Sequence, residues 1–383
     1  MLESVLVYGL LTLIMVVCGT IAASREPLYE GGSGIYVKNS FFLQPEIIVI
    51  IASFTFVFGC RYGVGVDYFH YLNAYENNTG ERFEFLFKAI SDFLRNIGFG
   101  YPVFFSLWAF LQITLLYYAF KNYRFIFPYI ALFLIFSSTM LSMMNIIRQQ
   151  LAACVFLVSL QFIEKKQPLY YYLCVLVAYW FHRSALILIV IYPLFYFHSD
   201  WFSRVWLQIV LYLLGVYLHN RFDIVTTYVE APFRWFSETL GFGRYGFGVL
   251  EIESLDDRSQ FGRNTGMGIY VSFFKTIPII LLSKDLKSFY NSHFFNMIYT
   301  GWFVSVLSGL AFGSSITLSR PFVFFMLFQT VLWSFFIYYC FRKQKPLLSI
   351  YAIGFLLLQI ALFVNIISFG EINTSAYTFF WQH

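Results

Sequence analysis

Arginine recurs at the edges of long apolar segments, where a permanent charge is costly and usually serves a function. Arg148, Arg320 and Arg61 each lie at such an edge, and Arg183 lies at a fourth. Guanidinium groups bind phosphate oxygens in a bidentate manner, and a diphosphate offers more acceptor oxygens than a carboxylate does. The pattern therefore predicts a diphosphate site, with Arg244 as a fifth member. The alternative is that these side chains only extend toward the membrane interface.

A polar stripe is predicted on the helix that carries Arg148. Asn145, Arg148 and Gln149 follow the i, i+3, i+4 spacing of one helix face, and Ala152 comes next on that face. Inside a membrane such a face must contact protein or water. It is therefore either a ligand site or a hydrogen-bonded seam between two helices.

His182 and Asp67 are the two side chains that could act as a general base. The unperturbed pKa of an imidazole lies near neutral pH, which favours His182 for this task. Asp67 follows two glycines, which permit a tight turn. The alternatives are that His182 is structural, with Ser184 capping the next helix, and that Asp67 caps a helix or pairs with Arg61.

Apolar runs dominate the sequence and must position these residues. Of the 383 residues, 59% are hydrophobic and 12% are charged, whereas a soluble domain carries about 25% charged residues. A helix of roughly 20 apolar residues spans the bilayer core. The sequence therefore predicts an all-α, polytopic membrane helical bundle, a single integral membrane domain over residues 1–383 with about 12 transmembrane helices. The expected segments are 4–23, 43–60, 101–120, 124–144, 146–163, 168–181, 184–198, 204–220, 264–283, 292–312, 319–341 and 347–368. Two of them, 168–181 and 184–198, are short and could enter the membrane without crossing it.

Charge predicts which ends of these helices face the cytoplasm. Lysine is concentrated in short turns on one side of the bundle, which the positive-inside rule assigns to the cytoplasm. Two longer loops, 61–100 and 221–263, then lie outside, and so do both termini. Residues 83–97 carry apolar side chains at helical spacing, which predicts an amphipathic helix on the outer membrane surface, and 229–245 could form a second.

Nothing in the sequence predicts a metal, nucleotide or redox cofactor. The five cysteines lie in or beside apolar runs and form no CxxC pair, so we expect them to be small buried side chains. The sequence contains no glycine-rich nucleotide loop, zinc motif or nucleic-acid-binding patch. We therefore expect no cofactor and no nucleic-acid partner.

In their order and spacing these motifs resemble those of the EpsG family, whose members are Wzy-type exopolysaccharide polymerases. The likeness rests on Arg61–Tyr68, Asn145–Gln149, Phe181–Ala185 and Ser319-Arg320. It covers most of the chain, about residues 40–345. Arg183 departs from the lysine that is common in the family but keeps the charge.

The resemblance implies a glycosyltransferase on the outer face of the bacterial inner membrane. Such a polymerase moves a growing glycan from undecaprenyl diphosphate to a repeat unit on the same lipid carrier, without a metal or a nucleotide sugar. A protein that controls chain length is an expected partner. The arginines would bind the diphosphate, and His182 or Asp67 would accept the proton of the acceptor hydroxyl. The side chains expected to contact the sugar or acceptor are Asn145, Gln149, Tyr62, Tyr68 and Tyr245.

Four other functions remain open at this level. An O-antigen ligase would use the same donor with a lipid A core as acceptor, and the residues alone do not separate it from a polymerase. A lipid-linked-sugar glycosyltransferase would use an acid in the first outer loop, which Asp67 permits. A flippase needs charge along a path that reaches both sides, whereas the polar groups here gather in the outer half. A non-enzymatic subunit of an export complex would not polymerise glycan alone.

Overall fold

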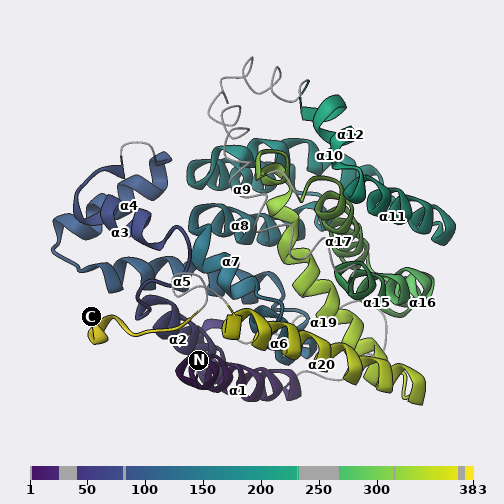
Figure 1. Ribbon diagram of the computed structural model, residues 1–383, viewed down its shortest axis with the longest axis horizontal. Helices are drawn as coiled ribbons and strands as arrows, with labels where there is room; N and C mark the ends of the chain where they lie inside the picture. Colours follow the sequence, from purple (N-terminus) through teal and green to yellow (C-terminus); the bar gives the residue numbers. More distant parts are fainter. Residues whose placement is uncertain are drawn as a thin grey trace.

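The structure is a computed structural model that describes residues 2–25, 41–80, 83–230, 232, 267–313, 316–369 and 376–383. The regular elements in these ranges are helices, and an isolated β-bridge joins Arg61 to Phe379. The helices pack side by side in a bundle (Figure 1). This confirms the predicted all-α class.

Five helical segments are long and apolar enough to cross a membrane, and two bent pairs raise the number to seven if each pair is one span. The five are α1 (Leu2–Ser24), α5 (Tyr101–Ala119), α17 (His293–Phe312), η8 with α19 (Arg320–Phe325 and Met326–Arg342) and most of α20 (Pro346–Phe369). The bent pairs are η3 (Arg124–Ile126) and α6 (Phe127–Phe136) with α7 (Thr139–Asn145), and α15 (Met267–Leu281) with α16 (Ser283–Tyr290).

Four further apolar segments are too short to span the bilayer core unaided. They are α2 (Pro45–Gly59), α9 (Pro168–Phe181), η4 with α10 (Arg183–Val190 and Ile191–Phe197) and α11 (Val205–Asn220). At 1.5 Å per residue a helix of 14 residues, such as α9, covers about 21 Å of a core about 30 Å thick. Every expected segment is helical where it is described, but the expected count of about 12 spans is not confirmed.

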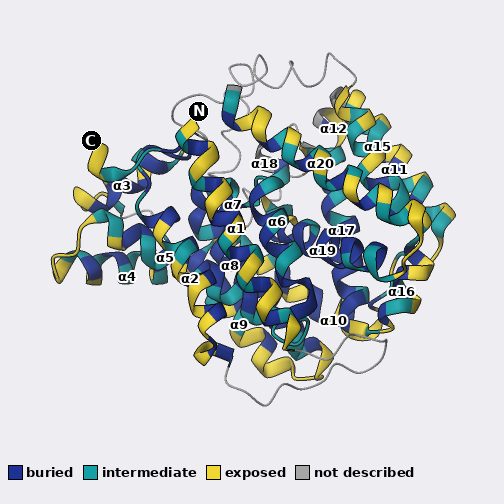
Figure 2. Cartoon of the chain, turned by 90° about the horizontal axis from the view of Figure 1, so that it is seen from below, coloured by how far each residue is buried: buried dark blue, intermediate teal, exposed yellow. Residues whose placement is uncertain are grey.

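The core of the bundle is formed by α17, α19 and α8 (Ile147–Glu164). Figure 2 shows these helices as mostly buried, whereas α1 and α20 present exposed residues along one side. In the segment Arg320–Arg342, 78% of the apolar window is buried, compared with 22% in Pro346–Ser368. The outer helices therefore have the exposed apolar surface that a lipid environment requires. The other elements are η1 (Phe41–Leu43), α3 (Tyr68–Glu76), α4 (Phe85–Asn96), α12 (Phe222–Val225), the π-helical turn η5 (Thr226–Glu230), α18 (Ile316–Ser319) and η9 (Phe380–Gln382).

The segment expected to span at 124–144 is broken between α6 and α7. Ser138 adopts φ +62°, and the two parts are bent by 63°. Hydroxyl groups stabilise the break, because Thr139 Oγ1 lies 2.7 Å from both Ser137 Oγ and Thr330 Oγ1 of α19. The break lets the following helix begin inside the bundle instead of at its surface.

The helix predicted over residues 83–97 is present as α4, whereas its position on the outer membrane surface stays a prediction. Phe87 is buried whereas Phe93 is 62% exposed, and Arg95 pairs with Asp92 at 2.6 Å on the polar face. α4 packs against α3 and α9. The second amphipathic helix, expected at 229–245, lies almost wholly outside the described residues.

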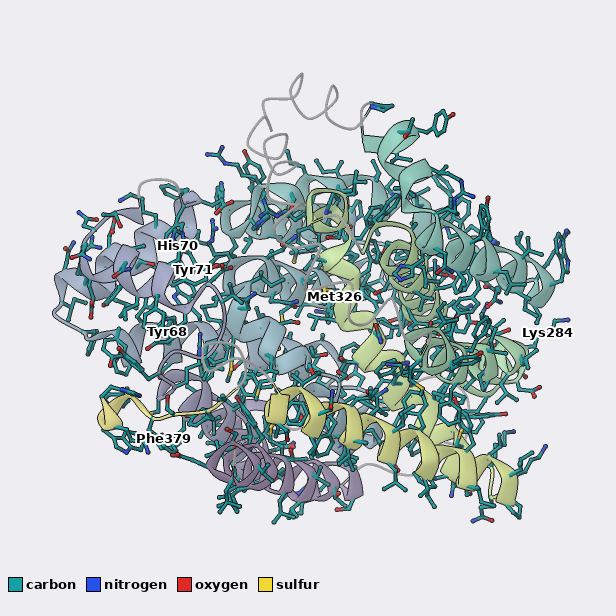
Figure 3. The ribbon with its side chains drawn as sticks, in the orientation of Figure 1. Tyr68, His70, Tyr71, Lys284, Met326 and Phe379 are labelled. Carbon is teal, nitrogen blue, oxygen red and sulfur yellow. The ribbon has the colours of Figure 1, made fainter. Side chains whose placement is uncertain are left out.

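The helices α3 and α16 lie far apart in the bundle. Figure 3 shows Tyr68, His70 and Tyr71 of α3 at one end and Lys284 of α16 at the opposite end. The first long loop and this lysine-containing turn therefore lie at opposite ends, as the expected alternation of helices requires.

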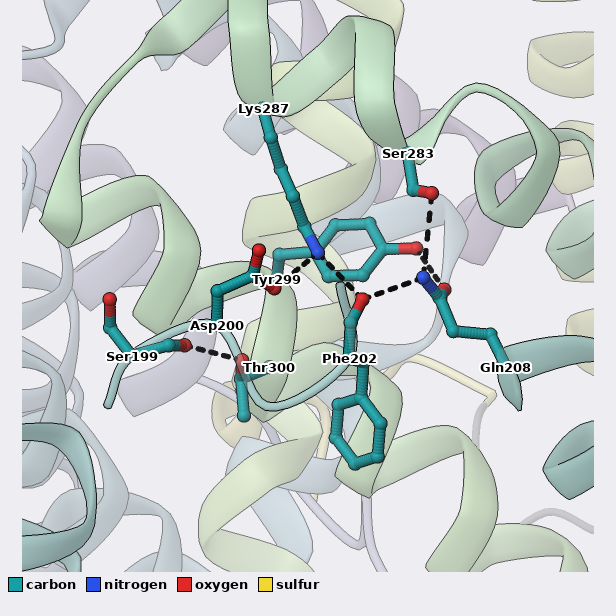
Figure 4. Close-up of polar contacts among 8 residues, drawn as sticks. All are labelled: Ser199, Asp200, Phe202, Gln208, Ser283, Lys287, Tyr299 and Thr300. Carbon is teal, nitrogen blue, oxygen red and sulfur yellow. Dashed lines mark hydrogen bonds and ion pairs between the residues drawn. The ribbon is translucent and has the colours of Figure 1, made fainter. Parts of the chain in front are cut away.

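A buried polar network holds α11, α16 and α17 together near the Lys284 end (Figure 4). Lys287 of α16 donates to the carboxylate of Asp200 and to the carbonyl oxygen of Phe202, the latter at 2.8 Å. Gln208 of α11 donates to the same carbonyl at 2.7 Å and accepts from the hydroxyl of Tyr299 of α17. Because these groups satisfy one another, we interpret the network as structural.

Candidate functional site

Three of the arginines predicted to bind diphosphate lie at the starts of helices. Arg148 is the second residue of α8, which begins after a break at Ile146, while Arg183 is the first residue of η4 and Arg320 the first of η8. Both η4 and α8 pack against η8, and Gln149 Nε2 donates to the carbonyl oxygen of Arg320 at 2.6 Å. The first turn of a helix carries unpaired N–H groups and the positive end of the helix dipole. At the start of η4 the backbone N–H groups of Arg183 and Ser184 donate to Glu84 and His182, whereas η8 continues directly from α18.

The two predicted base candidates, Asp67 and His182, lie near the same arginines. The charges of Arg148 and Arg320 act on both groups. Burial raises the pKa of Asp67 above its ordinary value, although His70 and the two arginines oppose the rise. In the turn between α9 and η4, burial lowers the pKa of His182 to about 4, a value that includes an opposing effect of Glu84 and the lowering effects of Arg148 and Arg320. The structure thus brings four of the predicted residues to one place.

Glu84 belongs to this site and is not among the residues predicted from the sequence. Its Oε2 accepts from Nη1 of Arg148, and its Oε1 accepts from the backbone N–H of Arg183 at 3.3 Å. The Glu84 side chain is only 10% exposed. The ion pair joins residues that are 64 positions apart, so no local pattern indicates it. Glu84 occupies the kind of position that an anionic ligand would take.

The guanidinium of Arg148 lies against aromatic rings of the first outer loop. Its central carbon is 4.6 Å from the ring centroid of Phe83 and 6.0 Å from that of Tyr71. Its Nε is buried and has no hydrogen-bond partner among the described residues. Buried donors are nearly always satisfied in proteins, so such an exception calls for an explanation. A ligand oxygen beside the Glu84 pair would supply the missing acceptor.

The loop between α2 and α3 presents Asp67 to the site. Gly65 adopts φ +102°, which disfavours any other residue type there. The backbone N–H of Asp67 donates to Asn145 Oδ1 at 2.8 Å. Asp67 occupies the N-cap position of α3, as predicted, but its carboxylate makes no capping hydrogen bond. Asn145 therefore positions the loop, and the Asp67 carboxylate is left available for chemistry.

Comparison with protein families accounts for the order of these motifs. The EpsG family model matches residues 47–380, which includes every residue of the site described so far. The chain belongs to the EpsG family. This is the family of Wzy-type exopolysaccharide polymerases, so the resemblance seen in the sequence is confirmed. A search of curated proteins gave no match, and a search of solved structures gave none either.

Arg61 has a structural environment in this EpsG protein, contrary to the prediction that it binds diphosphate. Its side chain is fully buried and donates to the carbonyl oxygens of Phe58, Val64 and Met144 at 2.7, 3.1 and 3.0 Å. All three guanidinium nitrogens are therefore bonded to the backbone. Arg61 holds the loop 61–67 against the end of α7, and we reassign it as a positioning residue.

The two tyrosines of the first loop that were predicted to contact sugar, Tyr62 and Tyr68, pack against other rings. Tyr68 is fully buried, its hydroxyl donates to the Arg61 carbonyl at 3.2 Å, and its ring stacks on Phe105 at 4.8 Å. This contradicts the prediction that Tyr68 contacts sugar, because its ring offers no exposed face. Tyr62 is half-buried and stacks on His383 at 4.2 Å.

Four other predicted residues have different outcomes. Gln149 is 5% exposed and bonded to the Arg320 backbone, so it positions that residue. The side chain of Arg183 is exposed at the edge of the site. Arg244 and Tyr245 lie outside the described residues, so their roles stay predictions.

His182, and not Ser184 as expected, caps η4. Its Nδ1 accepts from the backbone N–H of Ser184 at 3.3 Å and lies 2.7 Å from Ser184 Oγ. A backbone N–H can only donate, so Nδ1 is unprotonated and the neutral ring carries its hydrogen on Nε2. In this tautomer Nε2 is a hydrogen-bond donor and cannot accept a proton.

The C-terminal segment 376–383 closes over the first loop, a contact that was not predicted. The backbone N–H of Tyr62 donates to the Thr378 carbonyl at 2.8 Å, and that of Phe380 donates to the Cys60 carbonyl at 2.9 Å. Figure 1 shows this segment running beside α2. The partners are more than 300 residues apart (for example, 316 between Tyr62 and Thr378), so no local pattern indicates the contact.

The site is suited to a polyanion. Cationic side chains and helix starts surround it, and both acidic groups, Asp67 and Glu84, lie beside arginines. Across the described ranges, no three His, Cys, Asp or Glu side chains gather in an arrangement that would hold a metal ion.

Proposed function

We propose that this protein polymerises a bacterial surface polysaccharide. The donor is a growing glycan on undecaprenyl diphosphate, and the acceptor is a repeat unit on the same lipid carrier. The observation that chiefly supports this is the position of Arg148 and Arg320 beside both Asp67 and His182. The transfer requires cations for a diphosphate leaving group and a base for an acceptor hydroxyl. Membership of the EpsG family adds independent support.

The arginines would act on the leaving group. In the transfer the bond between C1 of the donor sugar and the diphosphate oxygen breaks, and its electron pair leaves with undecaprenyl diphosphate. Arg148, Arg320 and the N–H groups of the helix starts would stabilise the negative charge that develops there. Removing one such donor typically lowers the rate by about 10²–10³. Glu84 must release Arg148 when the diphosphate binds.

Asp67 is the base that the geometry favours. Its carboxylate makes no capping hydrogen bond, and burial raises its pKa, which makes it a stronger proton acceptor. The acceptor oxygen forms the new bond to C1, and its proton passes to Asp67. His182 would donate through Nε2 to a substrate oxygen. This reverses the order expected from the sequence, in which His182 was the first candidate.

The orientation of the bundle would place this reaction on the outer face of the inner membrane. Lys284 lies at the end opposite to α3 (Figure 3), and the positive-inside rule assigns lysine-rich turns to the cytoplasm. Lipid-linked donors and acceptors would then reach the site from the outer leaflet. A chain-length regulator would act on the same side.

Purified protein in lipid vesicles, supplied with undecaprenyl-diphosphate-linked repeat units, tests this function. We expect a ladder of products on a gel, also in the presence of a chelator. Arg148→Ala should abolish the ladder, whereas the control Arg95→Ala, which removes a half-buried arginine that bonds to Asp92 and to the Tyr75 carbonyl, should not. A folded wild-type protein that makes no ladder would contradict the proposal, and transfer to a lipid A core would identify a ligase. Loss of the ladder on chelation would overturn metal independence.

A further inference from the structure

An apolar groove lies between α5, α8 and α9. Its volume is about 400 Å³, and it is partly open to the outside of the bundle. Its lining comes from the three helices and is almost wholly apolar, with Leu111 on α5, Val158 on α8 and Cys174 on α9. None of these residues takes part in the site described above.

The groove begins at the candidate site. Leu151, in the lining, follows Arg148 by three residues and so lies about one turn further along the same side of α8. Phe181, also in the lining, immediately precedes His182. Phe162 lines the other end, and α8 rises about 16 Å between Leu151 and Phe162. The groove therefore runs from the cationic site along the length of the helix.

We propose that this groove binds the polyprenyl chain of a lipid diphosphate whose head group lies at Arg148. The inference rests on the proposed function, because it assumes a diphosphate at that position. One lipid would then occupy both features, with its anionic head among the helix starts and the first part of its chain between α8 and α9. The sugar would stay outside the groove, beside Asp67.

The diphosphate gives the polyprenyl chain its advantage over ordinary phospholipid chains. Lipid chains are as apolar as the groove, so the hydrophobic effect does not drive a chain from the bilayer into it. An unfilled groove forfeits dispersion contacts, which favours its occupation by some chain. A head group bound at Arg148 raises the effective concentration of its own chain at the mouth of the groove. Binding should therefore depend on both charge and chain.

Binding of two probes to protein in lipid nanodiscs tests the inference. Undecaprenyl diphosphate, titrated as a fraction of the nanodisc lipid, reports head and chain together, and inorganic diphosphate reports the head-group site alone. Cys174→Trp fills the middle of the groove, so it should weaken binding of undecaprenyl diphosphate about tenfold and leave inorganic diphosphate binding unchanged. Val177→Trp, on the same wall, should act in the same way.

Leu176→Trp is the matched control for these variants. It adds the same side chain to α9 at a position that is 42% exposed and outside the groove, so it should bind both probes as the wild type does. Circular dichroism shows whether each variant folds.

The outcomes separate the two proposals. If neither probe binds to wild-type protein, the proposed function fails and this inference fails with it. If inorganic diphosphate binds, but Cys174→Trp and Val177→Trp bind undecaprenyl diphosphate as tightly as Leu176→Trp does, only the groove inference is overturned. Equal competition by phosphatidylglycerol would also overturn it, because the groove would then be a general lipid site.

Discussion

Glu84 neutralises Arg148 in this structure. Its carboxylate binds the guanidinium of Arg148 and the N–H of Arg183, which are the groups a phosphate would use. Leaving one partner of a buried ion pair without the other is costly, so the carboxylate stabilises Arg148 until a second anion replaces it. Glu84 thus positions the arginine and, in the proposed reaction, would compete with the diphosphate.

Replacing Glu84 by Gln tests this competition. The neutral amide binds a guanidinium less strongly than a carboxylate does, so we expect Glu84→Gln to bind inorganic diphosphate several-fold more tightly. Isothermal titration calorimetry on the purified protein measures the effect, and Glu84→Asp, which keeps the charge, serves as the control. Weaker binding by Glu84→Gln would show that Glu84 only holds Arg148 in place.

The pH dependence of activity distinguishes the two base candidates. Burial raises the pKa of Asp67 above 3.8, and a base must be deprotonated, so activity should fall as the pH drops through that raised value. The pKa of His182, lowered to about 4, leaves its ring neutral from pH 5 to 9. We therefore expect Asp67→Asn to reduce polymerisation by about 10²-fold or more and His182→Gln to leave the acid limb in place. An acid limb near pH 6.5 that His182→Gln removes would restore His182 as the base.

Residue type alone did not separate the arginines of the candidate site from those enclosed by backbone carbonyls. Arg61 resembled Arg148 in the sequence, since both lie at the edge of an apolar run, but its guanidinium is enclosed by backbone carbonyls. Arg124 is likewise buried, and it donates to Gln44 and to the Lys121 carbonyl. These carbonyl oxygens converge on the guanidinium only once the chain is folded. Arg148 and Arg320, in contrast, were correctly expected to lie together.

The loop between α2 and α3 depends on a backbone conformation that only glycine adopts readily. Gly65 lies at φ +102°, and a Cβ there would be 3.5 Å from the Asn145 backbone. We expect Gly65→Ala to lower stability by about 2 kcal/mol and to reduce activity, because the loop carries Asp67. Thermal unfolding in detergent measures the first effect and the product ladder the second.

Gly9→Ala provides the control for this loop variant. Gly9 lies in α1 with nothing within 4 Å of an added Cβ, so the substitution should keep or slightly raise the unfolding temperature. Equal effects of Gly65→Ala and Gly9→Ala would show that the loop conformation is not under such a constraint.

At the level of the helices, apolar runs predicted where helices form but not the break within the segment 124–144. Each expected segment is helical where described, because runs of apolar residues must satisfy their backbone groups internally. No glycine or proline marks the breaks at Ser138 and Ile146. Hydroxyl contacts with Thr330 stabilise the first break, and these contacts form only after α19 has packed. The second break falls at the boundary between the expected segments 124–144 and 146–163. It places Asn145 at the end of α7 and Arg148 at the start of α8, so the polar stripe expected on one helix face is divided between two helices.

The C-terminal segment 376–383 packs against the first loop of the site. Its backbone bonds to Tyr62 and Cys60 hold the first loop, in which Arg61 and Asp67 lie. Deletion of residues 376–383 removes six hydrogen bonds to the rest of the chain, so we expect it to cost about 6 kcal/mol of stability and to lower the polymerisation rate. Gln382→Ala, which removes two exposed contacts, one with Glu3 and one with the backbone N–H of Phe379, should change both measurements little.

If the deletion variant unfolds at the wild-type temperature and polymerises at the wild-type rate, the segment is not needed to hold the loop.

For the whole molecule, the account requires that one anion binds to two arginines from separate helices. Calorimetric titration of inorganic diphosphate into wild-type protein, Arg148→Ala, Arg320→Ala and the double variant tests this most directly. We predict that each single variant loses at least about tenfold in affinity and that the double variant loses less than the product of the two, because residues that share one ligand are energetically coupled. Wild-type affinity in both folded single variants would contradict the account.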